Sequence, residues 1–275
     1  MKNLNLPSLM YGTAWKEDRT SQLTELALRS GFTAIDTANQ RKHYFEEAVG
    51  LGISNYLKAT GKKREELFLQ TKYTYARGQD HRKPYDENAS FADQVHQSFS
   101  SSLKHLNTDY IDSYVLHGPY SGEGISEVDQ EVWRSMEEIH NSGKVKYLGV
   151  SNVNLEQMQL LYDFAKVKPK FAQIRTYASR GWEKPLRDFC QINEIHFQGF
   201  SLLTANRNEL QSPTIKRLAS KYGKTVSQII FIFSRQVGII PLTGTTSAEH
   251  MKEDLNSFDI LLTQEELQEI ENVSF

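Results

Sequence analysis

The sequence alternates short apolar runs, typical of buried strands, with longer stretches whose apolar residues recur at helical spacing. Eight strand and helix units in 275 residues give about 34 residues per unit, which suits one strand, one helix and two short loops. The first expected strand lacks the Gly-x-Gly-x-x-Gly turn of an open dinucleotide-binding sheet. The sequence therefore predicts an α/β fold in which eight parallel strands close into a barrel, as one domain over residues 1–275.

The periodicity also gives approximate bounds for each element. We expect strands at residues 8–14, 34–38, 68–73, 110–118, 145–152, 171–177, 195–201 and 238–244. We expect helices at residues 20–29, 45–59, 89–106, 127–141, 155–165, 183–191, 214–222, 226–235, 249–256 and 264–272. The stretch 74–90 is polar and aromatic without a clear period, and its length is typical of a functional loop.

The composition is that of an ordinary globular protein, with 39% apolar and 24% charged residues. The net charge of -2 gives no global field that would attract nucleic acid or an anionic membrane. Cys190 is the one cysteine, so no internal disulfide can form, and no apolar run suits a signal peptide or a membrane span. We therefore expect a cytoplasmic protein with no nucleic-acid or membrane partner, and we favour a monomer.

Polar side chains stand where four of the expected strands end. Asp36, Lys72 and His117 close three of these strands, and Asn152 closes a fourth. Active-site residues of parallel barrels gather at the carboxyl ends of the strands, so these groups would face one pocket. Each has an alternative role, because Asp36 could cap a turn or helix, and Lys72 and His117 could be solvated loop residues.

These groups suit the reduction of a carbonyl compound. When hydride reaches the carbonyl carbon, negative charge grows on the oxygen and a nearby donor must stabilise it. A tyrosine phenol can supply the proton, and a neighbouring ammonium such as that of Lys72 favours the phenolate that remains. Asp36 could hold Lys72 charged and in place, and His117 could orient the carbonyl oxygen.

Several motifs, taken in order along the chain, resemble those of the aldo-keto reductases. They are Asp36-Thr-Ala38, Glu46 to Gly50, Thr71-Lys72, Leu116-His117, Gly149-Val-Ser-Asn152 and Gln173. The resemblance extends from Met10 to about Asp254. It implies a TIM barrel that binds NADPH in an extended pose and reduces aldehydes or ketones through an Asp, Tyr, Lys and His tetrad. Asp36, Lys72 and His117 match three members of this tetrad directly.

The tyrosine of the tetrad has no direct match. In the family it usually lies five residues after the aspartate, and here that position is Arg41. The segment 39–44 resembles a two-residue expansion, because Glu46 and its motif lie farther than usual from the aspartate. Counting back from Glu46 places His43 at the tyrosine's position, with Tyr44 beside it. We favour Tyr44 as the acid because a phenol suits the step; His43 is the alternative, and Tyr44 could instead pack against the helix.

The resemblance also implies a site for the nicotinamide cofactor. Ser151, Asn152 and Gln173 match residues that hold the nicotinamide carboxamide, while Phe200 replaces the tyrosine on which the ring stacks. The other matches are Ser201 and Leu203 for the diphosphate, Gly244, Thr245 and His250 for the phosphate-binding turn, and Glu253 and Asp254 for the adenine.

Part of this cofactor site departs from the family pattern. Gly244 and His250 replace the lysine and arginine that many members direct at the 2′-phosphate, and a neutral imidazole is a weak clamp. Glu253 and Asp254 could equally form a solvated helix face. We expect NADPH as the cofactor and keep NADH as the alternative.

Aromatic residues in the expected mouth loops are candidates for contact with the substrate. They are Trp15, Tyr73, Tyr75 and Tyr120, which would favour apolar or aromatic carbonyls unless they pack the core instead. We expect no metal, because no His-x-His pair or carboxylate cluster supplies three ligands at strand ends.

Two other functions remain open. A barrel of the same ancestry could bind a nucleotide as a regulatory or accessory protein with little turnover, an idea that the displaced tyrosine encourages. A metal-dependent hydrolase built on Asp36 and His117 has weaker support. The joint retention of Asp36, Lys72 and His117 favours the reductase, whose partner is a small carbonyl compound.

Overall fold

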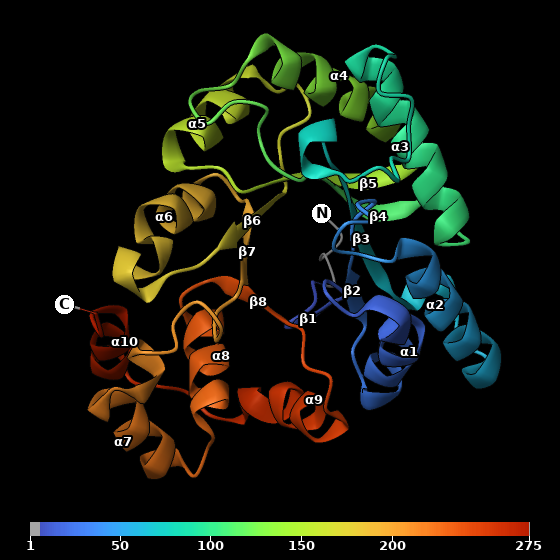
Figure 1. Ribbon diagram of the computed structural model, residues 1–275. Coiled ribbons are helices and arrows are strands. Elements are labelled where there is room, and N and C mark those ends of the chain that lie inside the picture. Colours follow the sequence, from blue (N-terminus) through green and yellow to red (C-terminus); the bar gives the residue numbers. More distant parts are fainter. Residues whose placement is uncertain (1–5, 275) are drawn as a thin grey trace.

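The computed structural model describes residues 6–274, in which eight parallel strands close into a barrel surrounded by helices (Figure 1). Each strand pairs with the next along the chain, and β8 pairs with β1. The strands are β1 Met10–Gly12, β2 Ala34–Asp36, β3 Phe68–Tyr73, β4 Ile111–Leu116, β5 Val145–Ser151, β6 Phe171–Arg175, β7 His196–Phe200 and β8 Ile239–Thr243. The predicted α/β barrel is confirmed.

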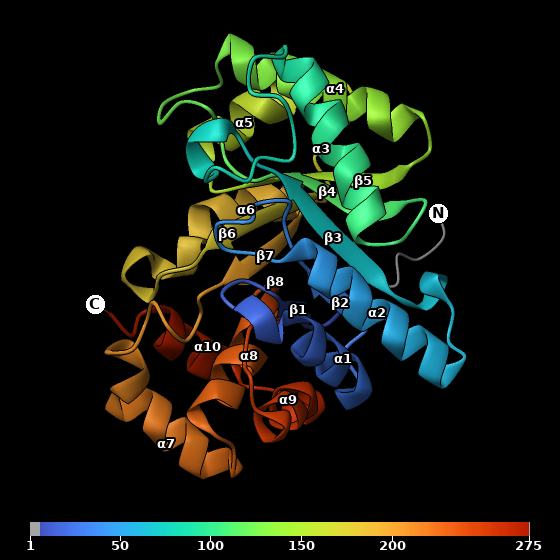
Figure 2. The same cartoon turned by 45° about the vertical axis from the view of Figure 1, so that its right-hand side comes forward.

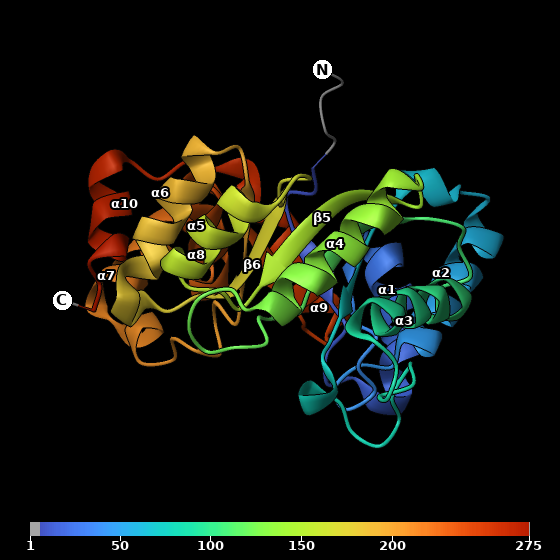
Figure 3. The same ribbon diagram turned by 90° about the horizontal axis from the view of Figure 1, so that it is seen from above.

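The helices surround the strands, as the two turned views show (Figures 2 and 3). They are α1 Thr20–Ser30, α2 Glu46–Thr60, α3 Phe91–His105, α4 Glu127–Asn141, α5 Leu155–Phe164, α6 Lys184–Ile192, α7 Pro213–Tyr222, α8 Val226–Gln236, α9 Ala248–Leu255 and α10 Gln264–Glu271. Short 3-10 turns lie at Glu17–Arg19, Arg64–Glu66, Ala76–Gly78, Ala178–Glu183, Glu209–Gln211 and Asn256–Asp259. Within residues 6–274, no helix is both long and apolar enough to cross a membrane.

Capping residues explain where several helices begin. Ser90 accepts a hydrogen bond from the backbone N–H of Asp93 at 3.1 Å, so α3 begins at Phe91, two residues after the predicted start at Ala89. Ser126 caps α4 in the same way, and there the predicted range 127–141 is confirmed.

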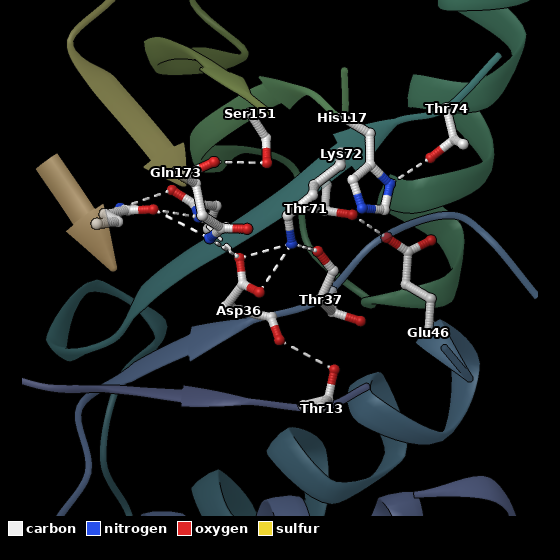
Figure 4. A network of polar contacts seen from close by, with 12 residues as sticks. Thr13, Asp36, Thr37, Glu46, Thr71, Lys72, Thr74, His117, Ser151 and Gln173 are labelled. Atoms are coloured by element: carbon white, nitrogen blue, oxygen red, sulfur yellow. Dashed lines mark hydrogen bonds and ion pairs between the residues drawn. The ribbon is translucent and has the colours of Figure 1, made fainter. Parts of the chain in front are cut away.

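Residues of β3 point alternately into the barrel and toward the helices. Gln70 and Lys72 face the interior, where both contact Asp36 of β2. Thr71 faces outward and donates a hydrogen bond to Glu46, the first residue of α2 (Figure 4). Tyr73 also faces outward and is fully buried. The strand therefore delivers its lysine to the barrel interior and its tyrosine to the core between strands and helices.

Helix α2 lies unusually close to both of its neighbours. A Cβ at Gly50 would lie 1.9 Å from the carbonyl oxygen of His105 in α3, and one at Gly52 would lie 2.5 Å from the carbonyl oxygen of Ser21 in α1. Glycine at these positions lets the backbones touch. Glu46 anchors the start of the helix, because its carboxylate also lies 3.0 Å from Nδ1 of His105.

Candidate active site

A cavity of about 860 Å³ opens where the strands end, within the size range typical of ligand sites. It is lined by all the residues predicted to bind the cofactor, namely Ser151, Asn152, Gln173, Phe200, Ser201, Leu203, Gly244, Thr245, His250, Glu253 and Asp254. Asp36, His43, Tyr44 and His117 line the same cavity. The fold thus brings the candidate catalytic and cofactor-binding groups to one place.

Lys72 lies fully buried beneath this cavity and is bound to Asp36 (Figure 4). Its ammonium is 2.7 and 2.8 Å from the two carboxylate oxygens of Asp36 and 2.7 Å from the carbonyl oxygen of Thr37. An ammonium has three N–H donors, and these three acceptors lie within hydrogen-bond distance of it. Burial lowers the pKa of Lys72, and the Asp36 carboxylate opposes that shift. Lys72 therefore acts on other groups through its charge.

Asp36 also accepts hydrogen bonds from two buried glutamines. The Oδ1 atom lies 2.7 Å from Nε2 of Gln70 and 2.9 Å from Nε2 of Gln173. Gln198 completes the group, because its Oε1 accepts from the same two amides at 2.8 and 3.1 Å. A carboxylate can only accept, so these contacts fix which way each amide points. The N–H groups of Gln173 are thereby engaged, and its oxygen remains for a ligand.

Tyr44 lies beside this charged pair at the cavity wall. Its ring centroid is 5.2 Å from the Lys72 ammonium and 5.9 Å from the centroid of the His117 imidazole, which it meets edge-on. Its hydroxyl makes no hydrogen bond to any residue in the range 6–274. Burial, with the Asp36 charge, raises the pKa of Tyr44 above its usual value. The phenol is therefore protonated at neutral pH and free to donate.

His43 lines the same cavity but packs elsewhere. Its ring stacks on Trp15 with centroids 4.1 Å apart, and its carbonyl oxygen accepts from the Trp15 N–H at 2.8 Å. Burial and the nearby Lys42 lower the pKa of His43. Of the two candidate acids, Tyr44 is the one whose ring contacts both Lys72 and His117.

His117 is neutral in this environment. Burial, with the charge of Lys72 and with His43, lowers the pKa of His117 to about 3. Its Nδ1 lies 2.7 Å from the hydroxyl of Thr74 (Figure 4). The Nδ2 of Asn152 donates to the carbonyl oxygen of His117 at 2.8 Å. Nε2 is the nitrogen left to meet a ligand.

The carboxamide end of the predicted cofactor site is built from strand ends. Ser151 is buried and donates to the carbonyl oxygen of Gln173 at 2.7 Å. Asn152 and Ser201 follow β5 and β7 in left-handed backbone conformations, with φ of 55° and 58°. Because the Asn152 amide nitrogen is already bonded, its side-chain oxygen is free to accept from a ligand.

The predicted phosphate and adenine end contains a cation that the sequence reading missed. The ammonium of Lys16, in the loop after β1, donates to the carbonyl oxygen of Gly244. Asp254 is buried nearby in the cavity wall and accepts from the hydroxyl of Thr243 at 2.7 Å. Burial raises the pKa of Asp254 to about 6, although this hydrogen bond and the charge of His250 oppose the shift.

Three of the four predicted substrate residues do not line this cavity. Trp15 lines it and is 68% exposed. Tyr73 and Tyr75 are buried in an aromatic cluster, where the Tyr75 hydroxyl donates to Asp129 at 2.9 Å, and Tyr120 packs on Tyr75 with ring centroids 5.1 Å apart. Strand alternation explains the misplacement of Tyr73, because its neighbour Lys72 faces inward.

Arg175 is a second lining residue that the sequence reading missed. It is exposed at the end of β6, two residues after Gln173. The alternation of strand residues places both on the same face, so the prediction of Gln173 contained the signal that could have identified Arg175.

Other candidate chemistry is weak in the part of the chain that the structure describes. No group of three or more His, Cys, Asp or Glu residues within 6–274 could hold a metal ion. Cys190 is buried, and burial raises the pKa of its thiol to about 12, so the thiol is unreactive.

Comparison with known proteins places the chain in a family. The profile of the Aldo/keto reductase family matches residues 8–274, so the chain belongs to the aldo/keto reductases, as its motifs predicted. A glyoxal reductase of Bacillus subtilis is 28% identical over 254 residues, which are 92% of this chain and 83% of that protein. The oxidoreductase YtbE of the same bacterium is 32% identical over 246 residues, with 89% and 80% covered.

Solved structures agree with the sequence relatives. An aldo-keto reductase of the silkworm Bombyx mori in complex with NADP matches with a TM-score of 0.82 and 28% identity, covering 98% of this chain and 89% of that one. This chain thus shares the TIM-barrel fold of its relatives and belongs with them among the oxidoreductases.

Proposed function

We propose that the protein is a carbonyl reductase that takes hydride from NADPH and uses Tyr44 as the proton donor. The observation that carries the proposal is the position of the Tyr44 ring, which lines the cavity beside both Lys72 and His117. Family membership supports the reaction class, and the NADP complex of the silkworm relative supports the cofactor.

The side chains along the cavity fit a nicotinamide dinucleotide. Asn152 and Gln173 each have an amide oxygen left over, and two acceptors suit the N–H groups of a carboxamide. Phe200 offers an aromatic face for the ring, and the Lys16 ammonium suits a phosphate oxygen. When bound, the reduced nicotinamide supplies the hydride.

The protein residues would then supply the proton and stabilise the charge left behind. Tyr44 donates its proton to the oxygen of the substrate, and the charge of Lys72 stabilises the phenolate left behind. Asp36 holds Lys72 in place through both carboxylate oxygens. His117 can donate from Nε2 if the Thr74 hydroxyl donates to Nδ1, and a neutral imidazole of this kind orients the carbonyl group.

The test compares Tyr44→Phe with His43→Ala in the reduction of glyoxal, following the oxidation of NADPH by absorbance. We expect the phenylalanine variant to lose roughly a hundredfold or more in kcat, the size of a general-acid contribution, and the alanine variant to keep most activity. Wild-type turnover in Tyr44→Phe would remove Tyr44 from the mechanism, and loss confined to His43→Ala would assign the acid to His43.

The same assay separates the remaining alternatives. Equal concentrations of NADPH and NADH are compared, and faster oxidation of NADH would overturn the cofactor proposed. Binding of NADPH without its oxidation by reactive aldehydes would favour the accessory protein.

A further inference from the structure

Arg175 lines the cavity at the end of β6, the strand whose Gln173 belongs to the buried polar network. Gln173 and Arg175 share the interior face of β6, while Ile174 between them is buried on the opposite face. Two strand residues span about 7 Å, so Arg175 begins one layer nearer the mouth than Gln173. Gln173 contacts Asp36 at 2.9 Å, and both Gln173 and Arg175 line the cavity, so a ligand bound beside the network lies within reach of this arginine.

The Arg175 guanidinium has no carboxylate partner among residues 6–274. Its guanidinium carbon lies 5.5 Å from the centroid of the Tyr177 ring. Two other arginines do have carboxylate partners: Arg187 pairs with Glu271, and Arg64 pairs with Asp112. Three carboxylates line the cavity. Asp36 is bound to Lys72 and Asp254 to a hydroxyl, and Glu253 forms no ion pair with Arg175. Arg175 is therefore a charged group of the cavity without a counter-ion of its own.

A guanidinium in this position suits one kind of ligand group. Its planar, positively charged fork matches the two oxygens of a carboxylate or a phosphate. Contact with the Tyr177 ring restrains the side chain, which reduces the entropy lost when a ligand binds.

We propose that Arg175 is an anion-binding residue of this cavity, in addition to Lys16. It takes an oxyanion from one of two sources, which are the carboxylate of an acidic aldehyde or ketone and the diphosphate of the dinucleotide. The inference rests on the proposed function, because the substrate and the dinucleotide supply the two oxyanions. It adds to that function a residue that favours negatively charged ligands.

The experiment uses Arg175→Gln, which removes the charge, and Arg175→Lys, which keeps the charge but loses the fork. Arg180→Gln is the matched control, because Arg180 is exposed and lies 4.7 Å from the same Tyr177 ring but does not line the cavity. Succinic semialdehyde and butanal, which differ in a carboxylate, are compared by kcat/KM. The Kd for NADPH is measured by quenching of tryptophan fluorescence.

The two sources give different results. If a substrate carboxylate binds, Arg175→Gln lowers kcat/KM for succinic semialdehyde by about tenfold to a hundredfold, as for a charged hydrogen bond, and leaves butanal unchanged. If the diphosphate binds, the Kd for NADPH rises by a similar factor and both aldehydes lose equally. In either case Arg175→Lys lies between the wild type and the glutamine variant.

Other outcomes overturn the inference. Changes within twofold in every measurement, or equal losses in Arg180→Gln, would show that Arg175 binds no anion. A wild-type protein that binds NADPH but reduces neither aldehyde would sink the proposed function alone. The Kd comparison would then decide on Arg175, with an unchanged Kd counting against it.

Discussion

Gln70 and Gln198 exchange two amide hydrogen bonds inside the barrel, with N–O distances of 2.8 and 3.0 Å. Both side chains are fully buried and neither lines the cavity, yet their partners Asp36 and Gln173 do. A buried polar network of this kind rigidifies its members only while each of them is satisfied. The glutamine pair thus supports the cavity floor from below.

Replacing Gln198 with methionine, which has a similar shape, would remove an acceptor from both Gln70 and Gln173. We expect the Kd for NADPH to rise roughly threefold to tenfold, the range for one neutral hydrogen bond. Gln94→Met is the control, because Gln94 is also buried and hydrogen-bonded but lies in α3 away from this network. Equal changes in both variants would mean that the network does not position Gln173.

The neutrality of His117 predicts the shape of the pH profile. Burial and Lys72 lower the pKa of His117 to about 3, so the charged form appears only as the pH falls toward that value. We expect kcat/KM to show no ionisation of His117 between about pH 5 and 8. The measurement compares the wild type with His117→Gln, whose profile is expected to be lower but parallel. An acidic limb near pH 6 that disappears in His117→Gln would contradict this.

The raised pKa of Asp254 predicts that nucleotide affinity depends on pH. Because burial raises the pKa of Asp254 to about 6, the carboxyl gains a proton as the pH falls through that value and a negative charge leaves the cavity wall. An anionic ligand should then bind roughly fivefold tighter, for about 1 kcal/mol of relieved repulsion.

The measurement is the Kd for NADPH at about pH 5 and 8 in the wild type and in Asp254→Asn. Phosphate groups of the ligand titrate equally with both proteins, so the difference between them isolates Asp254. Identical pH dependence in the two proteins would show that this carboxyl stays charged or lies too far from the ligand.

The contact between α2 and α3 predicts a large loss of stability. An alanine at Gly50 would place its Cβ 1.9 Å from a backbone oxygen of His105, and backbone cannot move aside cheaply. We expect Gly50→Ala to lower the free energy of unfolding by about 2 kcal/mol or more, despite the better helix propensity of alanine. Denaturant titration measures it. Gly122→Ala, which meets no atom within 4 Å, is the control and is expected to be neutral.

The fold could be predicted from sequence because each strand and helix carries its own apolar period. The predicted cofactor residues line one cavity because they follow strands, and the strand ends meet at one edge of the barrel. Pairings across the barrel could not be predicted in this way. The contact of Gln70 with Gln198 joins positions 128 residues apart, and no local pattern encodes it.

Other misses have simpler causes. Strand alternation accounts for Tyr73 and Arg175: the first faces the helices and is buried, and the second faces the cavity and is exposed. Lys16 follows a strand only three residues long, and the loop that carries it takes a positive φ of 61° at Trp15. Where a side chain points after such a turn depends on tertiary structure.

The close seating of α2 has one more consequence, for the loop that precedes it. A helix with no room to slide along α3 keeps its first residue, Glu46, at a set point in space, and Tyr44 stands two residues upstream of that point. Residues gained or lost after Asp36 can then bulge outward without carrying the phenol away. The start of α2 therefore sets where Tyr44 and its neighbour His43 reach the cavity, and the loop between Asp36 and this point can differ in length without moving either ring.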